Sequence, residues 1–74
     1  MQATSRGFRA GIDIGGTFTD FILFDEADSS IRLHKCLTTP ADPSTGALSG
    51  LADLASTAGI AIGDLDEVVH GTTL

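Results

Sequence analysis

The residues best suited to chemistry in this sequence lie in the segment GIDIGGTFTD. A tight turn at Gly15 and Gly16 exposes backbone N–H groups to an anion because no Cβ atom blocks close approach, and the hydroxyls of Thr17 and Thr19 add donors. Asp13 cannot contact a phosphate directly because two anions repel each other. It can instead hold a hydrated Mg²⁺ that bridges to phosphate oxygens. The segment therefore predicts a phosphate site with an associated magnesium ion.

Other interpretations of this segment stay open at the level of sequence. Two adjacent glycines are also common in a hairpin turn that needs positive φ. Asp20 either helps to position the loop or the metal, or it accepts hydrogen bonds from backbone N–H groups. Two well-known phosphate motifs are disfavoured, because neither the GxGxxG spacing of a dinucleotide-binding turn nor the GxxxxGK[ST] spacing of a P-loop is present.

A second polar segment, HGTT, begins at His70. Its histidine either approaches a substrate or phosphate, or simply forms a hydrogen bond at the end of a strand, since histidine serves both roles. His34 and Cys36 alternate on one face of another predicted strand, but two ligands do not make a zinc site, which normally needs three or four. We therefore expect Cys36 to be a partly buried thiol.

Hydrophobic alternation predicts three strands ahead of any helix. FRAGIDIG alternates from Phe8 onward, FTDFILFD at residues 18–25 predicts a strand with both faces largely covered, and IRLHKCLTT resumes the alternation from Ile31. The link between the first two strands is short enough for a hairpin. The three strands together predict an antiparallel meander.

Helical spacing replaces alternation in PADPSTGALSGLADLASTAG. Asp42 is suited to the N-cap, Pro43 to the first helical position and Gly59 to the residue just beyond the end. Gly46 and Gly50 weaken the helix intrinsically. We expect them to be tolerated where the helix lies close against the sheet.

The last element predicted is a short buried strand at Val68 and Val69. The helix before it permits a crossover connection, so this strand can run parallel to a member of the meander. Ligands of open α/β sheets gather at the carboxyl ends of strands. The glycine turn and the HGTT segment both follow strands, and we expect them to face one cleft.

Composition limits the class of protein. The chain has 74 residues, enough for one small domain, with ten acidic residues against four basic ones and a single cysteine. No basic cluster is available for a phosphate backbone, so nucleic acid is not an expected partner. No apolar run approaches the roughly 20 residues that cross a bilayer, and no secretory signal is evident, so we expect no membrane association and a cytoplasmic location.

Three ordered segments, DIGGTFTD, LTTPADPSTGALSGL and EVVHGTTL, together resemble the N-terminal region of the hydantoinase/oxoprolinase family. The resemblance extends over residues 9–74 as an incomplete nucleotide-binding domain, after an extension at residues 1–8. It implies an α/β fold of the ribonuclease H-like type shared by actin, sugar kinases and heat-shock chaperones. A sugar kinase is the weaker match, because only DIGGT is common there.

The resemblance also implies an activity: ATP, with Mg²⁺, is spent on opening a cyclic amide such as a hydantoin or 5-oxoproline, together with a companion B-type subunit or domain. The residues that it assigns are Gly15, Gly16, Thr17 and Thr19 for phosphate, Asp13 and Asp20 for the metal, and His70, Thr72 and Thr73 for catalysis.

Two alternatives accompany this expectation. Related ATP-dependent ketone carboxylases share the same N-terminal pattern, so a carboxylase subunit is one of them. Family members are far longer than this chain, so we expect a fragment that is inactive alone. The second alternative is accordingly a non-catalytic structural or interaction module.

Overall fold

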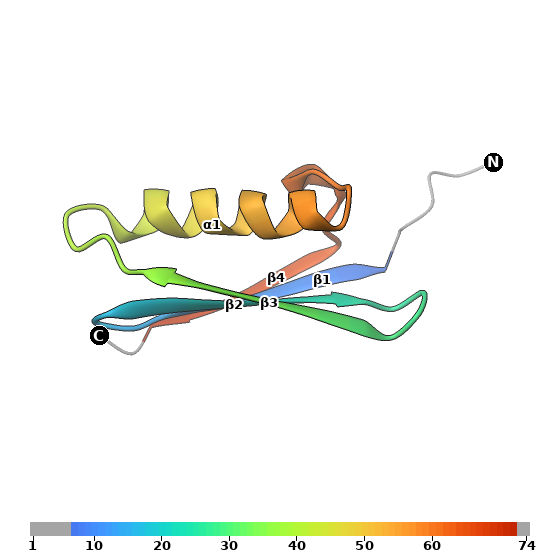
Figure 1. Ribbon diagram of the computed structural model, residues 1–74, viewed down its shortest axis with the longest axis horizontal. Coiled ribbons are helices and arrows are strands. Elements are labelled where there is room, and N and C mark those ends of the chain that lie inside the picture. The colour runs from blue at the N-terminus through green and yellow to red at the C-terminus, as the bar shows by residue number, and fades with distance from the viewer. Residues whose placement is uncertain (1–6, 73–74) are drawn as a thin grey trace.

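The computed structural model describes residues 7–72 of the chain. A four-stranded sheet carries one helix on one of its faces (Figure 1). The elements in chain order are β1 (Phe8–Ile14), β2 (Phe18–Asp25), β3 (Ser30–Leu37), α1 (Pro43–Thr57), the 3₁₀ turn η1 (Ile62–Asp64) and β4 (Glu67–Thr72). The sheet order is β3-β2-β1-β4, in which β1, β2 and β3 are antiparallel neighbours and β4 runs parallel to β1. The predicted meander, helix and parallel strand are confirmed.

Helix α1 begins and ends where its capping residues predict. The Asp42 carboxylate accepts hydrogen bonds from the Thr45 N–H at 3.3 Å and from the Thr45 hydroxyl at 2.6 Å. These bonds stabilise the ionised carboxylate, so the pKa of Asp42 lies below its ordinary value. At the other end Gly59 has φ +76°, and the Ile60 N–H donates to the Ala55 carbonyl at 3.2 Å, as in a Schellman motif. Within residues 7–72, no helix is both long enough and apolar enough to cross a membrane.

The covered face of the sheet forms the hydrophobic core against α1. Close approach of the helix explains its glycines: a Cβ atom at Gly50 would lie 2.4 Å from Cζ of Phe21, and one at Gly46 would lie 2.7 Å from the Thr39 hydroxyl. The expectation of tight packing on the sheet is confirmed for Gly50, whereas Gly46 lies against Thr39 in the loop between β3 and α1. The buried core side chains are Phe8, Ala10, Ile12, Ile14, Phe21, Leu23, Ala47, Leu51, Leu54, Ala55 and Ile60.

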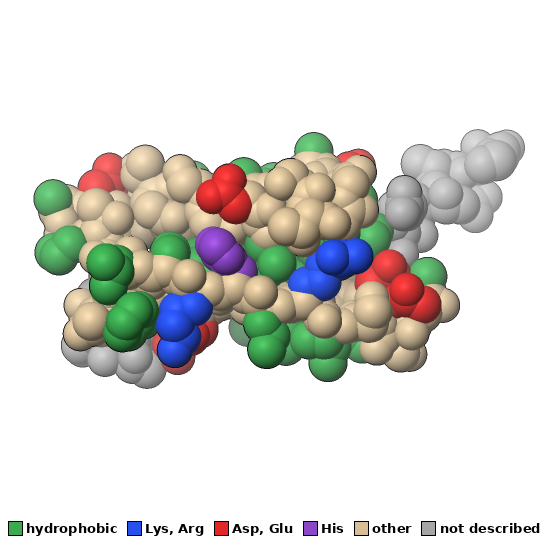
Figure 2. Space-filling view, viewed as in Figure 1, with side chains coloured by type: hydrophobic (Ala, Val, Ile, Leu, Met, Phe, Trp, Pro, Cys, Tyr) green, Lys and Arg blue, Asp and Glu red, His purple; other side chains and the backbone are tan. Residues whose placement is uncertain are grey.

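The other face of the sheet is open and β4 lies at its edge, and these two features correct two expectations. On β2, predicted to be covered on both faces, the side chains of Phe18 and Ile22 are 44% and 40% exposed. β4, predicted to be buried, is an edge strand whose Val68 and Val69 are exposed. For Phe18, Ile22 and Val69 the reason is that a strand points alternate side chains to opposite faces, and the single helix covers only one of them. Val68 pairs with the buried Ala10 on the covered face and is exposed because β4 lies at the edge of the sheet. Apolar side chains gather on the side of the sheet away from α1 (Figure 2).

Candidate phosphate and metal site

The carboxyl ends of β1 and β4 lie side by side at one edge of the sheet. The two strands are parallel neighbours, and Ile14 at the end of β1 pairs with Thr72. The turn at residues 15–17 leaves β1 at this edge. The glycine turn and the described part of the HGTT segment are therefore brought together, while Thr73 lies outside the described residues.

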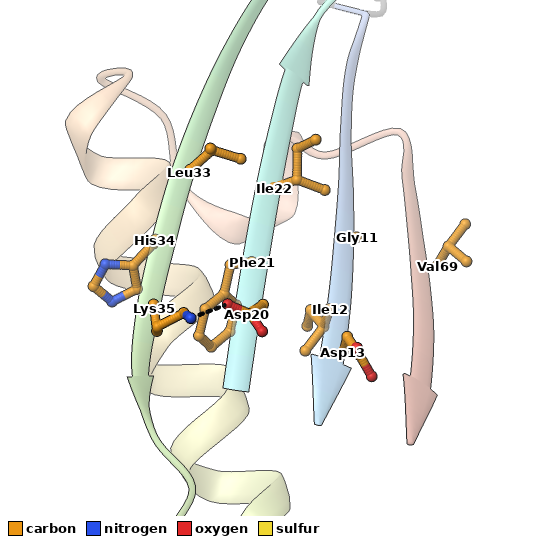
Figure 3. A pocket seen from close by; sticks show the side chains of 10 residues that line it. All are labelled: Gly11, Ile12, Asp13, Asp20, Phe21, Ile22, Leu33, His34, Lys35 and Val69. Atoms are coloured by element: carbon orange, nitrogen blue, oxygen red, sulfur yellow. Dashed lines mark ion pairs between the residues drawn. The ribbon is translucent and has the colours of Figure 1, made fainter. Parts of the chain in front are cut away.

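Three charged residues form a row across the open face near this edge. Asp13 on β1 pairs directly with Asp20 on β2, and Asp20 pairs with Lys35 on β3. Lys35 Nζ lies 3.4 Å from Oδ1 of Asp20 (Figure 3). Asp13 has no ion pair or hydrogen bond through its carboxylate with any residue in the range 7–72. Gly71 of β4 continues the row beyond Asp13.

The charges of this row are unbalanced at Asp13. Two carboxylates directly opposite each other on one sheet face repel and destabilise the pair, and Lys35 neutralises only the Asp20 side. Carboxylate oxygens are ligands that Mg²⁺ prefers. No group of three or more His, Cys, Asp or Glu side chains suited to a metal occurs among the residues described. The chain therefore fits an ion held by one or two carboxylates with water and phosphate oxygens, which is the usual protein environment of Mg²⁺.

The glycine turn is not explained by a need for positive φ. In residues 7–72 positive φ occurs at Gly7, Ser29 and Gly59, but not at Gly15 or Gly16. The interpretation of the glycine pair as a positive-φ turn is therefore wrong for this hairpin. A Cβ atom at Gly16 would meet nothing within 4 Å, so packing inside the chain does not require a glycine there either. The open space beside the Gly16 backbone is what close approach by a ligand requires.

The two predicted threonines of the turn differ in environment. Thr17 is exposed. Thr19 is only 3% exposed, and its Oγ1 lies 2.9 Å from Oγ1 of Thr38. The Thr19 hydroxyl is thus occupied inside the protein, on the side of the sheet that α1 covers.

Thr38 itself was missed by sequence reasoning. It follows the last residue of β3 and is 9% exposed. Its hydroxyl donates to the Gly15 carbonyl at 2.7 Å, and its N–H donates to the Thr17 carbonyl at 2.8 Å. The signal in the sequence was a threonine directly after a strand of alternating apolar and polar residues, which alone does not indicate a partner in another hairpin.

His70 lies on the opposite face from the charged row. It pairs with Ile12, whose side chain faces α1, and it lines a groove of about 420 Å³ together with Leu51 and Val68. The open face has its own hollow of about 710 Å³, lined by Asp13, Asp20 and Lys35 at one end and by apolar side chains such as Leu33 at the other. The sheet therefore separates His70 from Asp13 and Asp20.

The fold and this site define an α/β domain with a candidate anion-binding turn beside paired carboxylates. Residues 9–74 match the hydantoinase/oxoprolinase N-terminal region. The chain belongs to the hydantoinase/oxoprolinase family, and it corresponds to the N-terminal region of that family.

Three curated relatives support this assignment. The chain is 43% identical over 68 residues to an uncharacterized protein of Methanocaldococcus jannaschii, covering 92% of this chain and 9% of that protein. It is 42% identical over 71 residues to caprolactamase subunit alpha of Pseudomonas jessenii, covering 90% of this chain and 10% of the subunit. It is 37% identical over 67 residues to the acetophenone carboxylase gamma subunit of Aromatoleum aromaticum, covering 85% of this chain and 9% of that subunit. The chain thus spans about a tenth of the length of these relatives.

Proposed function

We propose that this chain is the first phosphate-binding part of an ATP-dependent enzyme that opens cyclic amides. The observation that carries the proposal is the outward-facing Gly16, where neither backbone conformation nor internal packing requires glycine, at the edge next to the Asp13–Asp20 pair. The relative named caprolactamase supports a cyclic amide as the substrate class. Its designation as subunit alpha supports a companion subunit in the complete protein.

Each residue of the turn has a defined part in this proposal. The N–H of Gly16 and the hydroxyl of Thr17 donate to phosphate oxygens, while Asp13 and Asp20 hold Mg²⁺. The ion supplies positive charge to the phosphates when bound. In the reaction, the amide oxygen of the ring attacks the γ-phosphorus and ADP leaves. Water then adds to the ring carbon that carries the phosphorylated oxygen. The C–N bond of the ring breaks as the nitrogen takes up a proton and leaves as an amine. A second water hydrolyses the resulting acyl phosphate to a carboxylate and inorganic phosphate. Such transfer depends mainly on positioning and charge stabilisation, which a donor-lined turn supplies.

The catalytic roles of His70, Thr72 and Thr73 stay predictions. His70 faces the groove beside α1 rather than the charged row, and that groove is not lined by Gly15 or Gly16. We therefore assign the proposed phosphate contacts to the turn and no step to His70.

The first experiment is an NMR titration of the ¹⁵N-labelled 74-residue chain with Mg·ATP. The proposal expects saturable shifts at the amides of Gly16 and Thr17, and their loss in Asp13→Ala. Asp53→Ala is the matched control, because Asp53 is an exposed carboxylate on α1. Absence of shifts in the unmodified chain, or equal shifts in Asp13→Ala, would count against a nucleotide site and favour the non-catalytic module.

A chimera extends the test to turnover. The matching segment of caprolactamase subunit alpha is replaced by this chain, and ADP release is measured with and without caprolactam. We expect substrate-dependent ADP release that falls at least about 100-fold in Asp13→Ala, because losing only an outer partner of a metal site already costs up to that factor. An inactive chimera that assembles normally would contradict the proposal.

A ketone carboxylase is the second candidate, supported by the similarity to the acetophenone carboxylase gamma subunit. The two enzymes would share the phosphate turn, so the chimera does not separate them. ATP turnover by the complete protein that carries this region distinguishes the two candidates. Dependence on a hydantoin or lactam supports the amide hydrolase, whereas dependence on bicarbonate and acetophenone supports the carboxylase.

A further inference from the structure

Two threonines are the buried polar side chains of the described chain, and both lie beneath the glycine turn. Thr19 of β2 and Thr38 after β3 are 3% and 9% exposed. A buried hydroxyl is costly unless it is hydrogen-bonded, and both of these are. Both lie under the only glycine pair in the sequence. Packing alone does not explain why hydroxyl groups are placed there.

The hydrogen bonds of this pair have a defined direction. The Thr38 hydroxyl has one hydrogen, which it donates to the Gly15 carbonyl at 2.7 Å. It can therefore only accept in its 2.9 Å contact with Thr19, so the Thr19 hydroxyl is the donor there. The backbone N–H of Thr38 donates to the Thr17 carbonyl at 2.8 Å. Thr38 thus holds both the Gly15 carbonyl and the Thr17 carbonyl of the turn.

Holding these carbonyls orients the amides of the turn. In a trans peptide the C=O of one residue and the N–H of the next point in opposite directions, and no cis peptide occurs in the described residues. Because the Gly15 carbonyl points toward Thr38, the Gly16 N–H points away from it. No hydrogen bond within residues 7–72 uses that N–H.

We propose that Thr38 is a positioning residue that fixes the peptide between Gly15 and Gly16 so that the Gly16 N–H is presented to phosphate. The inference rests on the proposed nucleotide-binding function. It adds the residue that orients the Gly16 N–H, the group that donates to phosphate. Thr38 touches no ligand itself. Its effect passes through the hydrogen bond of its hydroxyl to the Gly15 carbonyl.

The test compares Thr38→Val, which removes the hydroxyl at nearly constant shape, with Thr38→Ser, which keeps it. Thr57→Val is the control, because the Thr57 hydroxyl also donates to a backbone carbonyl, that of Leu54, at the far end of α1. The probe is inorganic tripolyphosphate with Mg²⁺, followed at the Gly16 amide of the 74-residue chain by NMR. We expect binding about tenfold weaker in Thr38→Val, equivalent to about one lost hydrogen bond. Thr38→Ser and Thr57→Val should stay close to the unmodified chain.

The possible outcomes separate this inference from the function on which it rests. No response at Gly16 in the unmodified chain overturns both. A response of equal affinity in Thr38→Val overturns the positioning role alone, as does a Thr38→Ser variant that is as weak as Thr38→Val.

The caprolactamase chimera provides a second measurement in case Thr38→Val unfolds the isolated chain. There Thr38→Val should impair ATP use through a higher KM for ATP or a lower kcat, with the KM for caprolactam unchanged. A rise in both KM values would indicate a general structural defect and overturn the inference.

Discussion

The two faces of the sheet are built by the same alternation of side chains but have opposite characters. On the covered face, Leu23 is 1% exposed and packs in the core beneath α1. On the open face, Leu33 is 75% exposed. The charged row of Asp13, Asp20 and Lys35 lies on this open face as well. Stability therefore comes from one face, whereas the residues of the proposed metal site sit on the other, where they contribute little to holding the fold together.

The largest expected effect compares one leucine from each face. Leu23→Ala should lower the free energy of unfolding by about 2–5 kcal/mol, because it leaves a cavity beneath α1. Leu33→Ala should change it by no more than about 0.5 kcal/mol, since the side chain contacts mainly solvent. Urea unfolding of the 74-residue chain measures both. Similar losses in the two variants would mean that the open face is covered in solution.

Two glycines provide the next comparison. Alanine normally favours a helix over glycine by about 1 kcal/mol, yet Gly50→Ala should destabilise the chain by about 1–3 kcal/mol, because the new Cβ meets the Phe21 ring at 2.4 Å. Gly16→Ala should leave the free energy of unfolding within about 0.5 kcal/mol, since the Cβ enters open space. The same Gly16 variant should nevertheless weaken the response to Mg·ATP. Stabilisation by Gly50→Ala would refute the close packing of α1 on the sheet.

A smaller effect concerns the start of α1, on which the covered face depends. Asp42→Ala should lower the free energy of unfolding at pH 7, because the Thr45 N–H and hydroxyl lose their acceptor. The pKa of Asp42 is depressed in the folded chain, so its contribution is present above the unfolded value of 3.8 and is lost as the pH falls through the folded pKa. The difference in the free energy of unfolding between the unmodified chain and Asp42→Ala should therefore shrink in acid. Urea unfolding at a series of pH values measures it, and a difference that persists well below pH 3.8 would contradict the cap.

Much of this architecture could be predicted from the sequence because its determinants are local. Alternation gave the strands, Asp42 and Gly59 gave the limits of α1, and the glycine turn gave the hairpin. The covering of each face could not be predicted, because alternation distinguishes two faces without indicating what lies on either. The face of His70 depends on its register with Ile12, and the bond between Thr38 and Gly15 joins residues 23 positions apart. Neither is encoded in a short segment.

The smallest effect expected on stability is also the one that links the open face to its proposed ligand. Asp13→Asn should raise the free energy of unfolding by roughly 0.2–1 kcal/mol without Mg²⁺, because it removes the repulsion between directly opposed carboxylates. Added Mg²⁺ should stabilise the unmodified chain but not this variant, since binding to the folded state alone stabilises it by mass action. Urea unfolding with and without MgCl₂ measures both effects, with NaCl at equal ionic strength as the control for screening. If NaCl reproduces the effect of MgCl₂, the two carboxylates repel each other but bind no specific ion. If Asp13→Asn is destabilising, the carboxylate has a structural role in the sheet.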